Sequence, residues 1–313
     1  MEAKNSLVKT QKQTFSVFLG TDAMKRKINE MVGGEKGQQF ITSIISAVST
    51  NPQLAECDNA TILSAALVGQ ALNLSPSPQL GQYYLVPFNK TIKRPDGSKY
   101  QIKVAQFQLG YKGYIQLAIR SGCYKKLNVL AIKEGELIKY DPLNEEIEVN
   151  LIEDEEEREK AKTIGYYAMF EYTNGFRKSI YWSYKKMLVH ADKYSNAFSK
   201  EAYEKIQKGK ILQNDLWKYS SFWYKDFDGM AYKTMLRQLI SKWGIMSIDM
   251  QKAYESDMAE IKEDGSYEYV DNTDTIDVDT TMTAEAENAP VQENESAVSQ
   301  QTQEENADDP FLN

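Results

Sequence analysis

The hydrophobic period of this chain changes twice along its length, and this alternation limits the folds that it can adopt. Apolar side chains recur at helical spacing in five segments, residues 22–32, 37–49, 58–72, 184–194 and 228–243. Asp58 or Asn59 can cap the third of these helices, because short polar side chains accept hydrogen bonds from the first free amides of a helix.

The middle of the chain is instead rich in β-branched and aromatic residues, which favour strands. Five strands are predicted, at residues 82–88, 100–109, 127–132, 147–152 and 163–172. Pro95-Asp96-Gly97 marks a turn between the first two, and Asn174-Gly175 predicts a tight hairpin that continues into residues 176–182. Helices, then antiparallel strands, then helices indicate the α+β class.

Charge is distributed unevenly along the chain. In residues 258–313, 16 Asp or Glu residues stand against the single Lys262, a balance of −15 that leaves +7 for the residues before them. This last part is also poor in apolar residues, so it cannot bury enough surface to offset the entropy of ordering. We therefore expect a flexible N-terminus at residues 1–20, a folded domain at 21–255 and a disordered acidic tail at 256–313.

The residue types exclude several classes of function. The chain has two cysteines, Cys57 and Cys123, and one histidine, His190, too few for a disulfide framework or a His-rich zinc site, and a reducing cytoplasm fits this composition. We expect no membrane span, no signal peptide and no phosphate-binding loop for ATP, because none of their patterns is found. A cationic body is typical of proteins that bind polyanions, whereas the acidic tail also fits a solubilising role.

The segment that follows the second predicted strand carries a candidate binding surface. On a helix from about Gly110, the side chains of Lys112, Gln116 and Arg120 share one face at four-residue spacing. This spacing resembles that of phosphates along an extended strand, and both Lys and Arg bind phosphate. Gly110 and Gly113 would let a backbone approach the helix start, where free amides attract anions. A solvated amphipathic helix is the simpler interpretation of the same pattern.

Other cations stand beside aromatic rings. Single-stranded nucleic acid requires this combination, because its backbone attracts charge and its unpaired bases stack on rings. The combination occurs at Tyr124-Lys125-Lys126, at Phe176-Arg177-Lys178 with Tyr181-Trp182, and at Tyr184-Lys185-Lys186. In a chain with 20 Tyr, however, most rings belong to the core. Along the last predicted helix, Lys233, Arg237 and Lys242 form a second possible line for phosphate.

Two carboxylates precede that last helix. Asp226 and Asp228 have a spacing that could hold Mg²⁺ for nuclease chemistry. One of them more simply caps the helix, where a carboxylate meets the positive end of the dipole. His190, Cys57 and Cys123 lack an evident activating partner and are expected to be structural or inert.

Six blocks of the sequence point to a known family. They are ALNLSP (71–76), GQYYLVPF (81–88), FQLGYKGYIQLAIRSG (107–122), NGF (174–176), WYKDFDGMAYKT (223–234) and LISKWGIM (239–246). In this order they resemble the RecT family of phage and prophage recombinases. Several blocks in the right succession are far more specific than any one of them.

The resemblance implies an ATP-independent single-strand annealing protein, similar in function to Red-beta. It implies a Rad52-like α+β annealing fold, binding of single-stranded DNA and of the annealed duplex, a homo-oligomeric ring or helical filament, and a 5′-to-3′ exonuclease as partner in a bacterial cytoplasm. No catalytic residue is implied, since annealing breaks no covalent bond, and no cofactor beyond an effect of Mg²⁺ on DNA binding. The candidate DNA contacts are Lys112, Gln116, Arg120, Lys125, Lys126, Arg177, Lys178, Lys233, Arg237, Lys242, Phe107 and Tyr111.

The acidic tail leaves further hypotheses open. Its last residues, Asp308-Asp-Pro-Phe-Leu-Asn, are similar to the tip of bacterial single-strand binding proteins, although Leu312 and Asn313 follow the Phe here. Contact with such a host protein and competition of the tail with DNA are both possible roles. Two other classes of function are alternatives: a Mg-dependent nuclease that uses Asp226 and Asp228, and a structural phage assembly protein.

Overall fold

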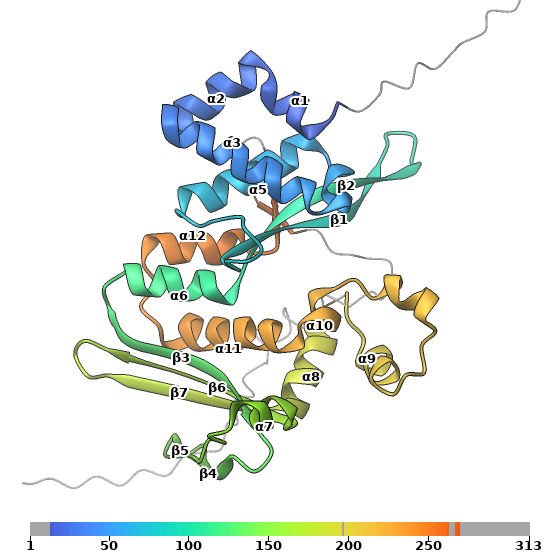
Figure 1. The fold of residues 1–313 in the computed structure, drawn as a ribbon. Helices are drawn as coiled ribbons and strands as arrows, with labels where there is room; N and C mark the ends of the chain where they lie inside the picture. Colours follow the sequence, from blue (N-terminus) through green and yellow to red (C-terminus); the bar gives the residue numbers. More distant parts are fainter. Residues whose placement is uncertain (1–12, 196, 263–266, 270–313) are drawn as a thin grey trace, which may run out of the picture. The chain divides into compact units, whose positions relative to one another are not determined.

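The computed structural model describes residues 13–195, 197–262 and 267–269 of the chain (Figure 1). The chain divides into two units, residues 1–274 and 275–313, and all described residues belong to the first. This unit contains helices and antiparallel sheets, as the α+β prediction requires. None of its described helices is long and apolar enough to cross a membrane.

Five helices open the described part: α1 (Phe15–Gly20), α2 (Asp22–Val32), α3 (Gly34–Ser49), α4 (Pro52–Ala55) and α5 (Asn59–Ala71). The Asp58 side chain caps α5 by accepting hydrogen bonds from the amides of Ala60 and Thr61, as predicted. α1 corrects the last part of the flexible N-terminus expected at residues 1–20, of which residues 1–12 lie outside the described residues. Phe15 and Leu19 are buried in the core, and α1 packs against α2 and α3.

A long β-ribbon and a helix follow. β1 (Tyr83–Lys93) and β2 (Lys99–Leu109) pair antiparallel over their whole length and lie against α5. Gly97 has a φ of 82°, a conformation that favours glycine, and forms the predicted turn between the two strands. The chain then enters α6 (Tyr111–Arg120), which packs on the later helices α11 (Phe227–Trp243) and α12 (Ile248–Ser256).

The second sheet has three antiparallel strands in the order β3-β6-β7. Its strands are β3 (Tyr124–Lys133), β6 (Thr163–Tyr172) and β7 (Arg177–Ser183). Asn174-Gly175 makes the predicted hairpin turn between β6 and β7, and Gly175 has a φ of 88°. α11 packs against all three strands, and α8 (Tyr184–Tyr194) leads away from β7 (Figure 1).

Several short elements were not predicted from the sequence. They are β4 (Leu137–Asp141), α7 (Glu155–Lys160), α9 (Lys200–Gln207), η1 (Gln213–Lys218), α10 (Phe222–Lys225), α12, β8 (Ala259–Ile261) and β9 (Tyr267–Tyr269). The strand expected at residues 147–152 is β5 (Glu146–Val149), which pairs with β4. Most of these elements are too short to show a clear hydrophobic period.

The folded domain also extends beyond the boundary expected at residue 255. Asp257 is buried, and the Met258 amide donates a hydrogen bond to the Phe107 carbonyl at 3.0 Å. Glu260 forms an ion pair with Lys90 at 2.7 Å. Backbone hydrogen bonds and ion pairs, rather than a large apolar surface, hold this segment, which is why composition alone placed it in the tail. The rest of the expected disordered tail lies outside the described residues, apart from β9.

Candidate nucleic-acid interface

α6 presents the predicted line of polar side chains to solvent. Its apolar side packs on α11 and α12, while Lys112, Gln116 and Arg120 are exposed along the other side. The Arg120 Nε donates a hydrogen bond to the Gln116 carbonyl at 3.3 Å. Within the described part of the chain, neither Lys112 nor Arg120 pairs with a carboxylate. This α6 line can therefore bind phosphate without first breaking an ion pair.

The start of α6, in contrast, is already occupied by the protein backbone. The Gly110 amide donates a hydrogen bond to the Gln82 carbonyl at 2.8 Å. A Cβ atom on Gly110 would lie 2.1 Å from the Gly81 carbonyl oxygen, and one on Gly113 would lie 2.2 Å from that of Gln82. The two glycines thus allow the segment before β1 to pack here. The backbone that approaches the helix start at these glycines is therefore the protein's own.

A second set of exposed and partly exposed side chains lies where β7, α8 and α11 meet. We call it the basic–aromatic strip, and it consists of Lys178, Trp182, Lys186, His190, Tyr194, Lys242 and Trp243. Side chains alternate along a strand, so β7 directs Lys178 and Trp182 to the same face. Lys186 and His190 are four residues apart on α8, and therefore neighbours on its surface.

Cations and rings lie within contact distance of one another along the strip. The Lys186 Nζ is 4.4 Å from the centre of the Trp182 ring, and the His190 ring centre is 5.1 Å from that of Trp182. At the other end, the Trp243 ring has Lys178 Nζ at 4.4 Å and Lys242 Nζ at 5.8 Å. Trp243 is 40% exposed and Tyr194 is 67% exposed, so both rings are accessible to a ligand.

Like charges are crowded in the strip. Burial lowers the pKa of Lys186, and the nearby charge of Lys242 lowers it further. Neither lysine has a carboxylate partner among the residues that the structure places. Burial and the charge of Lys186 likewise lower the pKa of His190 below its usual 6.5, so this imidazole is neutral near pH 7. His190 therefore contributes a ring to the strip, and the lysines contribute its charge.

The other predicted cations of this region lie at the surface but have partners. Lys125 and Lys126 pair with Glu171, at 2.6 Å and 3.4 Å. The Arg177 guanidinium donates a hydrogen bond to the Tyr167 hydroxyl at 3.4 Å. Exposed ion pairs of this kind contribute little to stability, so phosphate can replace them at small cost.

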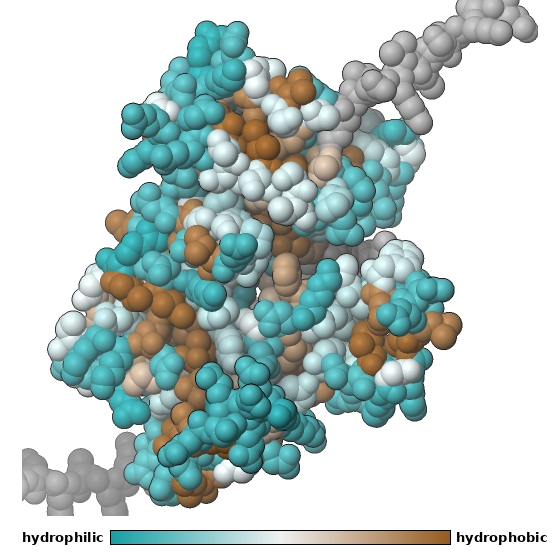
Figure 2. Space-filling view, viewed as in Figure 1, coloured by the Kyte–Doolittle hydropathy of each residue, from teal (hydrophilic) through white to brown (hydrophobic). Residues whose placement is uncertain are grey.

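In Figure 2, hydrophobic and hydrophilic surfaces adjoin where α6, α11 and β3 meet.

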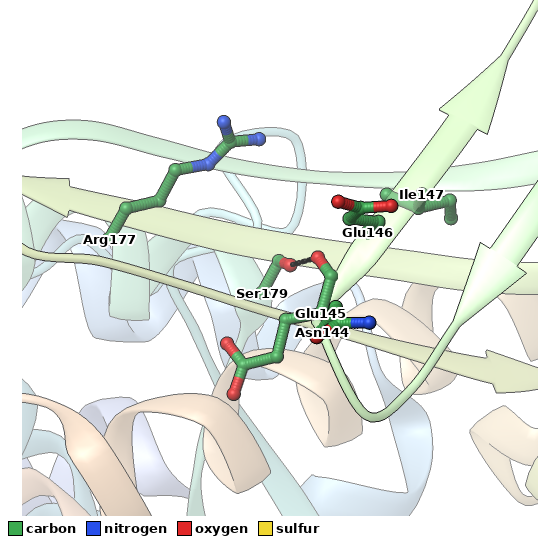
Figure 3. Close-up of a pocket in the computed structure, with 6 residues that line it drawn as sticks. All are labelled: Asn144, Glu145, Glu146, Ile147, Arg177 and Ser179. Carbon is green, nitrogen blue, oxygen red and sulfur yellow. Dashed lines mark hydrogen bonds between the residues drawn. The ribbon is translucent and has the colours of Figure 1, made fainter.

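Carboxylates limit the strip on the side of the β4–β5 turn. Glu145 forms an ion pair with Lys178, and its carbonyl accepts a hydrogen bond from the Ser179 hydroxyl at 3.4 Å (Figure 3). Glu145, Glu146, Arg177 and Ser179 line a pocket at this turn. The Arg177 side chain points away from Glu145. Because these carboxylates repel phosphate, the cationic surface ends near Lys178.

Two predicted contacts, Phe107 and Lys233, are wrong because their side chains are buried. Phe107 is fully buried, and Lys233 is 5% exposed. The Lys233 ammonium lies 2.8 Å from one carboxylate oxygen of Asp257, and the Arg237 guanidinium lies 2.6 Å from the other. The four-residue spacing of the two cations is real, and both pair with Asp257. The Arg237 side chain keeps 30% of its surface exposed, so its contact with DNA stays a prediction. Tyr111 is half-buried, with its ring 5.5 Å from that of Tyr232.

The two carboxylates considered for Mg²⁺ both have structural partners. Asp226 caps α11 and accepts a hydrogen bond from the Gly229 amide at 2.9 Å. Asp228 accepts a hydrogen bond from the Tyr166 hydroxyl at 2.6 Å. Burial, and then this contact with Asp228, raise the pKa of Tyr166. Over the described ranges, no three His, Cys, Asp or Glu side chains gather into a possible metal site. These contacts support the capping interpretation.

The structure also adds residues that were not among the predicted DNA contacts. Trp182, Lys186, His190, Tyr194 and Trp243 join the strip only through the packing of α8 and α11 on the sheet. The sequence did show the signal for part of this set, as Tyr181-Trp182 beside Tyr184-Lys185-Lys186. It could not show that Lys242 and Trp243, some 60 residues later in the chain, complete the same surface.

Comparisons with known proteins identify a family and two relatives. A model of the RecT family matches residues 38–270. The chain is 38% identical over 275 residues to the uncharacterized protein YqaK of Bacillus subtilis, covering 88% of this chain and 80% of that protein. It is 26% identical over 245 residues to Protein RecT of Escherichia coli, covering 78% of this chain and 80% of that protein.

Proposed function

The chain belongs to the RecT family of single-strand annealing recombination proteins, and we propose that it holds its first DNA strand along the basic–aromatic strip. In this proposal, annealing proceeds without ATP and without a cofactor. The lysines grip phosphates, and the exposed rings stack on unpaired bases. Correct pairing with a second strand then supplies the free energy of the reaction.

The observation that carries this proposal is the pair formed by Lys186 and Lys242. The two charges disfavour each other, and no carboxylate of the described residues offsets either one. A phosphate placed near both removes this repulsion, and its binding releases counterions from the DNA. Trp182 and Trp243 lie against the same two cations, so a backbone held there brings its bases close to rings.

The α6 line has a different chemistry. Lys112, Gln116 and Arg120 are exposed, and the Tyr111 ring, 6.0 Å from the Lys112 Nζ, is half-buried against Tyr232. We propose that this line contacts phosphates without stacking on bases. It would then accept single and paired strands alike, whereas the strip would favour unpaired DNA. Lys125, Lys126, Arg177 and Lys178 remain proposed phosphate contacts that first exchange their present partners.

The assembly follows from the family. RecT-family membership supports an oligomer that binds and anneals single-stranded DNA. We propose a ring or helical filament, in which the strip of one copy continues into that of the next. A 5′-to-3′ exonuclease and a host single-strand binding protein are the proposed partners, and Mg²⁺ is a proposed modulator of DNA binding.

The test compares two double variants of the full-length protein. Lys186→Ala/Lys242→Ala removes the crowded charges, and Lys25→Ala/Lys27→Ala removes two exposed lysines from α2. We expect the strip variant to bind a labelled oligonucleotide more weakly, with the slope of log affinity against log salt reduced by about 1.4, or about 0.7 for each lost phosphate contact. It should also anneal complementary oligonucleotides more slowly. Equal slopes for the two variants would reject the strip as the site.

A further inference from the structure

The β1–β2 ribbon carries a third cationic surface, apart from the α6 line and the basic–aromatic strip. The inner half of the ribbon is part of the core, with Tyr83, Leu85, Phe107 and Leu109 buried. Its outer half is largely exposed, including both strand ends and the turn. A two-stranded ribbon without a buried face is only marginally stable in water. Core packing therefore does not explain why the ribbon extends this far.

The charges of this outer end are arranged at a cost to the fold. Lys93 and Lys99 are register partners, directly opposite each other across the two strands. Like charges in this position destabilise a strand pair. No carboxylate lies within ion-pair distance of either lysine in the portion of the chain that the structure covers. Asp96, in the turn, accepts hydrogen bonds from the amide and hydroxyl of Ser98.

An arginine and a ring complete this surface. The Arg94 guanidinium lies 4.7 Å from the centre of the Tyr100 ring. Stacking on the ring holds the planar guanidinium while its N–H groups stay free for an anion. Lysines on a ribbon edge also prevent pairing with other strands. That role needs neither two lysines face to face nor an arginine held on a ring, so a polyanion is the better match.

The annealing reaction has a need that this surface can meet. A second strand must approach a first strand whose phosphates repel it, and the cations of the strip are already engaged by the first strand. Cations on another part of the molecule would reduce this repulsion. The ribbon packs on α5 and β8, whereas the strip is built on β7, α8 and α11 (Figure 1). The two surfaces therefore belong to different parts of the fold.

We propose that Lys93, Arg94 and Lys99 at the ribbon tip bind the backbone of the incoming complementary strand. The tip would lower the repulsion between strands while bases search for their partners. This inference rests on the proposed function, because it presupposes that a first strand is held elsewhere. In this proposal the ribbon increases the rate of annealing and does not contribute to the affinity for the first strand.

The experiment uses full-length protein and two labelled complementary oligonucleotides added in sequence. The test variant is Lys93→Ala/Arg94→Ala/Lys99→Ala, and the control, Lys25→Ala/Arg26→Ala/Lys27→Ala, removes the same three charges from the exposed side of α2. We expect the test variant to bind the first strand within about twofold of the wild type. Its annealing rate should fall about tenfold at low salt, the scale of electrostatic steering, while the control anneals normally.

The other outcomes separate this inference from the proposed function. Annealing by the test variant at the wild-type rate would overturn the inference. An equal loss of first-strand affinity would also overturn it, since the ribbon would then belong to the first site. If wild-type protein failed to anneal, the proposed function itself would fail. Lys93→Arg/Lys99→Arg should retain the normal rate because it keeps both charges, and a tenfold loss there would count against a phosphate contact.

Discussion

Lys233 and Arg237 lie in the middle of α11, and Lys242 lies at its end, yet the environments of these cations are opposite. The first two share the buried carboxylate of Asp257. Lys242 is exposed, close to a second lysine and beside an accessible Trp243. A cation with a buried countercharge is fixed in the fold, whereas a cation crowded by like charges gains from binding an anion. The comparison separates cations with a structural partner from a cation that we propose binds DNA, on a single helix.

Electrostatics within the buried cluster support this division. Burial lowers the pKa of Lys233, and the carboxylate of Asp257 offsets part of the effect. For Arg237, burial acts in the same direction, but Tyr114 and Asp257 outweigh it and raise the pKa. Asp257 also accepts a hydrogen bond from the Leu109 amide at 2.9 Å. One carboxylate thus joins α11, β2 and the segment after α12.

The largest predicted effect comes from removing that carboxylate. Asp257→Ala leaves Lys233 and Arg237 without their countercharge, one of them buried, and should lower the free energy of unfolding by about 3–5 kcal/mol. Chemical denaturation measures this change. The matched variant Asp249→Ala removes an exposed carboxylate of α12 and should cost far less. If the free energy of unfolding fell by a similar amount in both variants, the buried carboxylate would have no special role in holding the two cations.

An intermediate effect is expected at the exposed end of the helix. Trp243→Ala should weaken binding of single-stranded DNA by about 1–3 kcal/mol, the range measured for a base stacked on an aromatic ring. Trp217, which is 74% exposed on η1 and also lies near a lysine, provides the control. Titration of a labelled oligonucleotide gives both affinities. If Trp217→Ala weakened binding as much as Trp243→Ala, the strip would have no special role.

The smallest predicted effect is on the pH dependence of the free energy of unfolding. It comes from a third cation with a buried partner. Arg158 pairs with Glu136 at 2.6 Å. Burial acts to raise the pKa of Glu136, but the Arg158 guanidinium and two backbone amides outweigh it and hold the pKa below 4.5, its ordinary value. The pair therefore stabilises the fold above pH 4.5, and this contribution is lost as the pH falls through the lowered pKa.

Unfolding measurements at neutral and acidic pH check this sign. In Glu136→Gln, the part of the acid destabilisation that comes from this carboxylate should disappear. Lys126→Ala breaks an exposed pair with Glu171 and should leave the pH dependence nearly unchanged. A steeper acid destabilisation in Glu136→Gln than in the wild type would contradict the assignment.

Much of the fold could be predicted from the sequence because its long elements have clear periods. The bounds of α2, β6 and α8 agree with those predicted, and Asp58 caps α5 as expected. The α6 line was predicted because a single helix carries it. The strip was predicted only in part, because three elements far apart in the sequence have to pack together before it exists.

The mistaken assignment of Lys233 has an identifiable cause. Residues after 255 were assigned to the acidic tail on composition, so Asp257 was not considered as a partner for α11. Without this carboxylate, the spacing of Lys233 and Arg237 resembles that of an exposed phosphate line. The buried carboxylate of Asp257, rather than the helical spacing, determines the environment of these two side chains. The position of this carboxylate depends on tertiary structure.

The most direct test of the central claim is photo-cross-linking of the full-length protein to a single-stranded oligonucleotide that contains halogenated uracil. This base reacts with an aromatic ring stacked on it, and mass spectrometry of the peptides identifies the ring. We predict cross-links to Trp243, Trp182 or Tyr194, in the strip. Cross-links that fall on Trp217 or on other rings, and spare all three of these, would contradict the account.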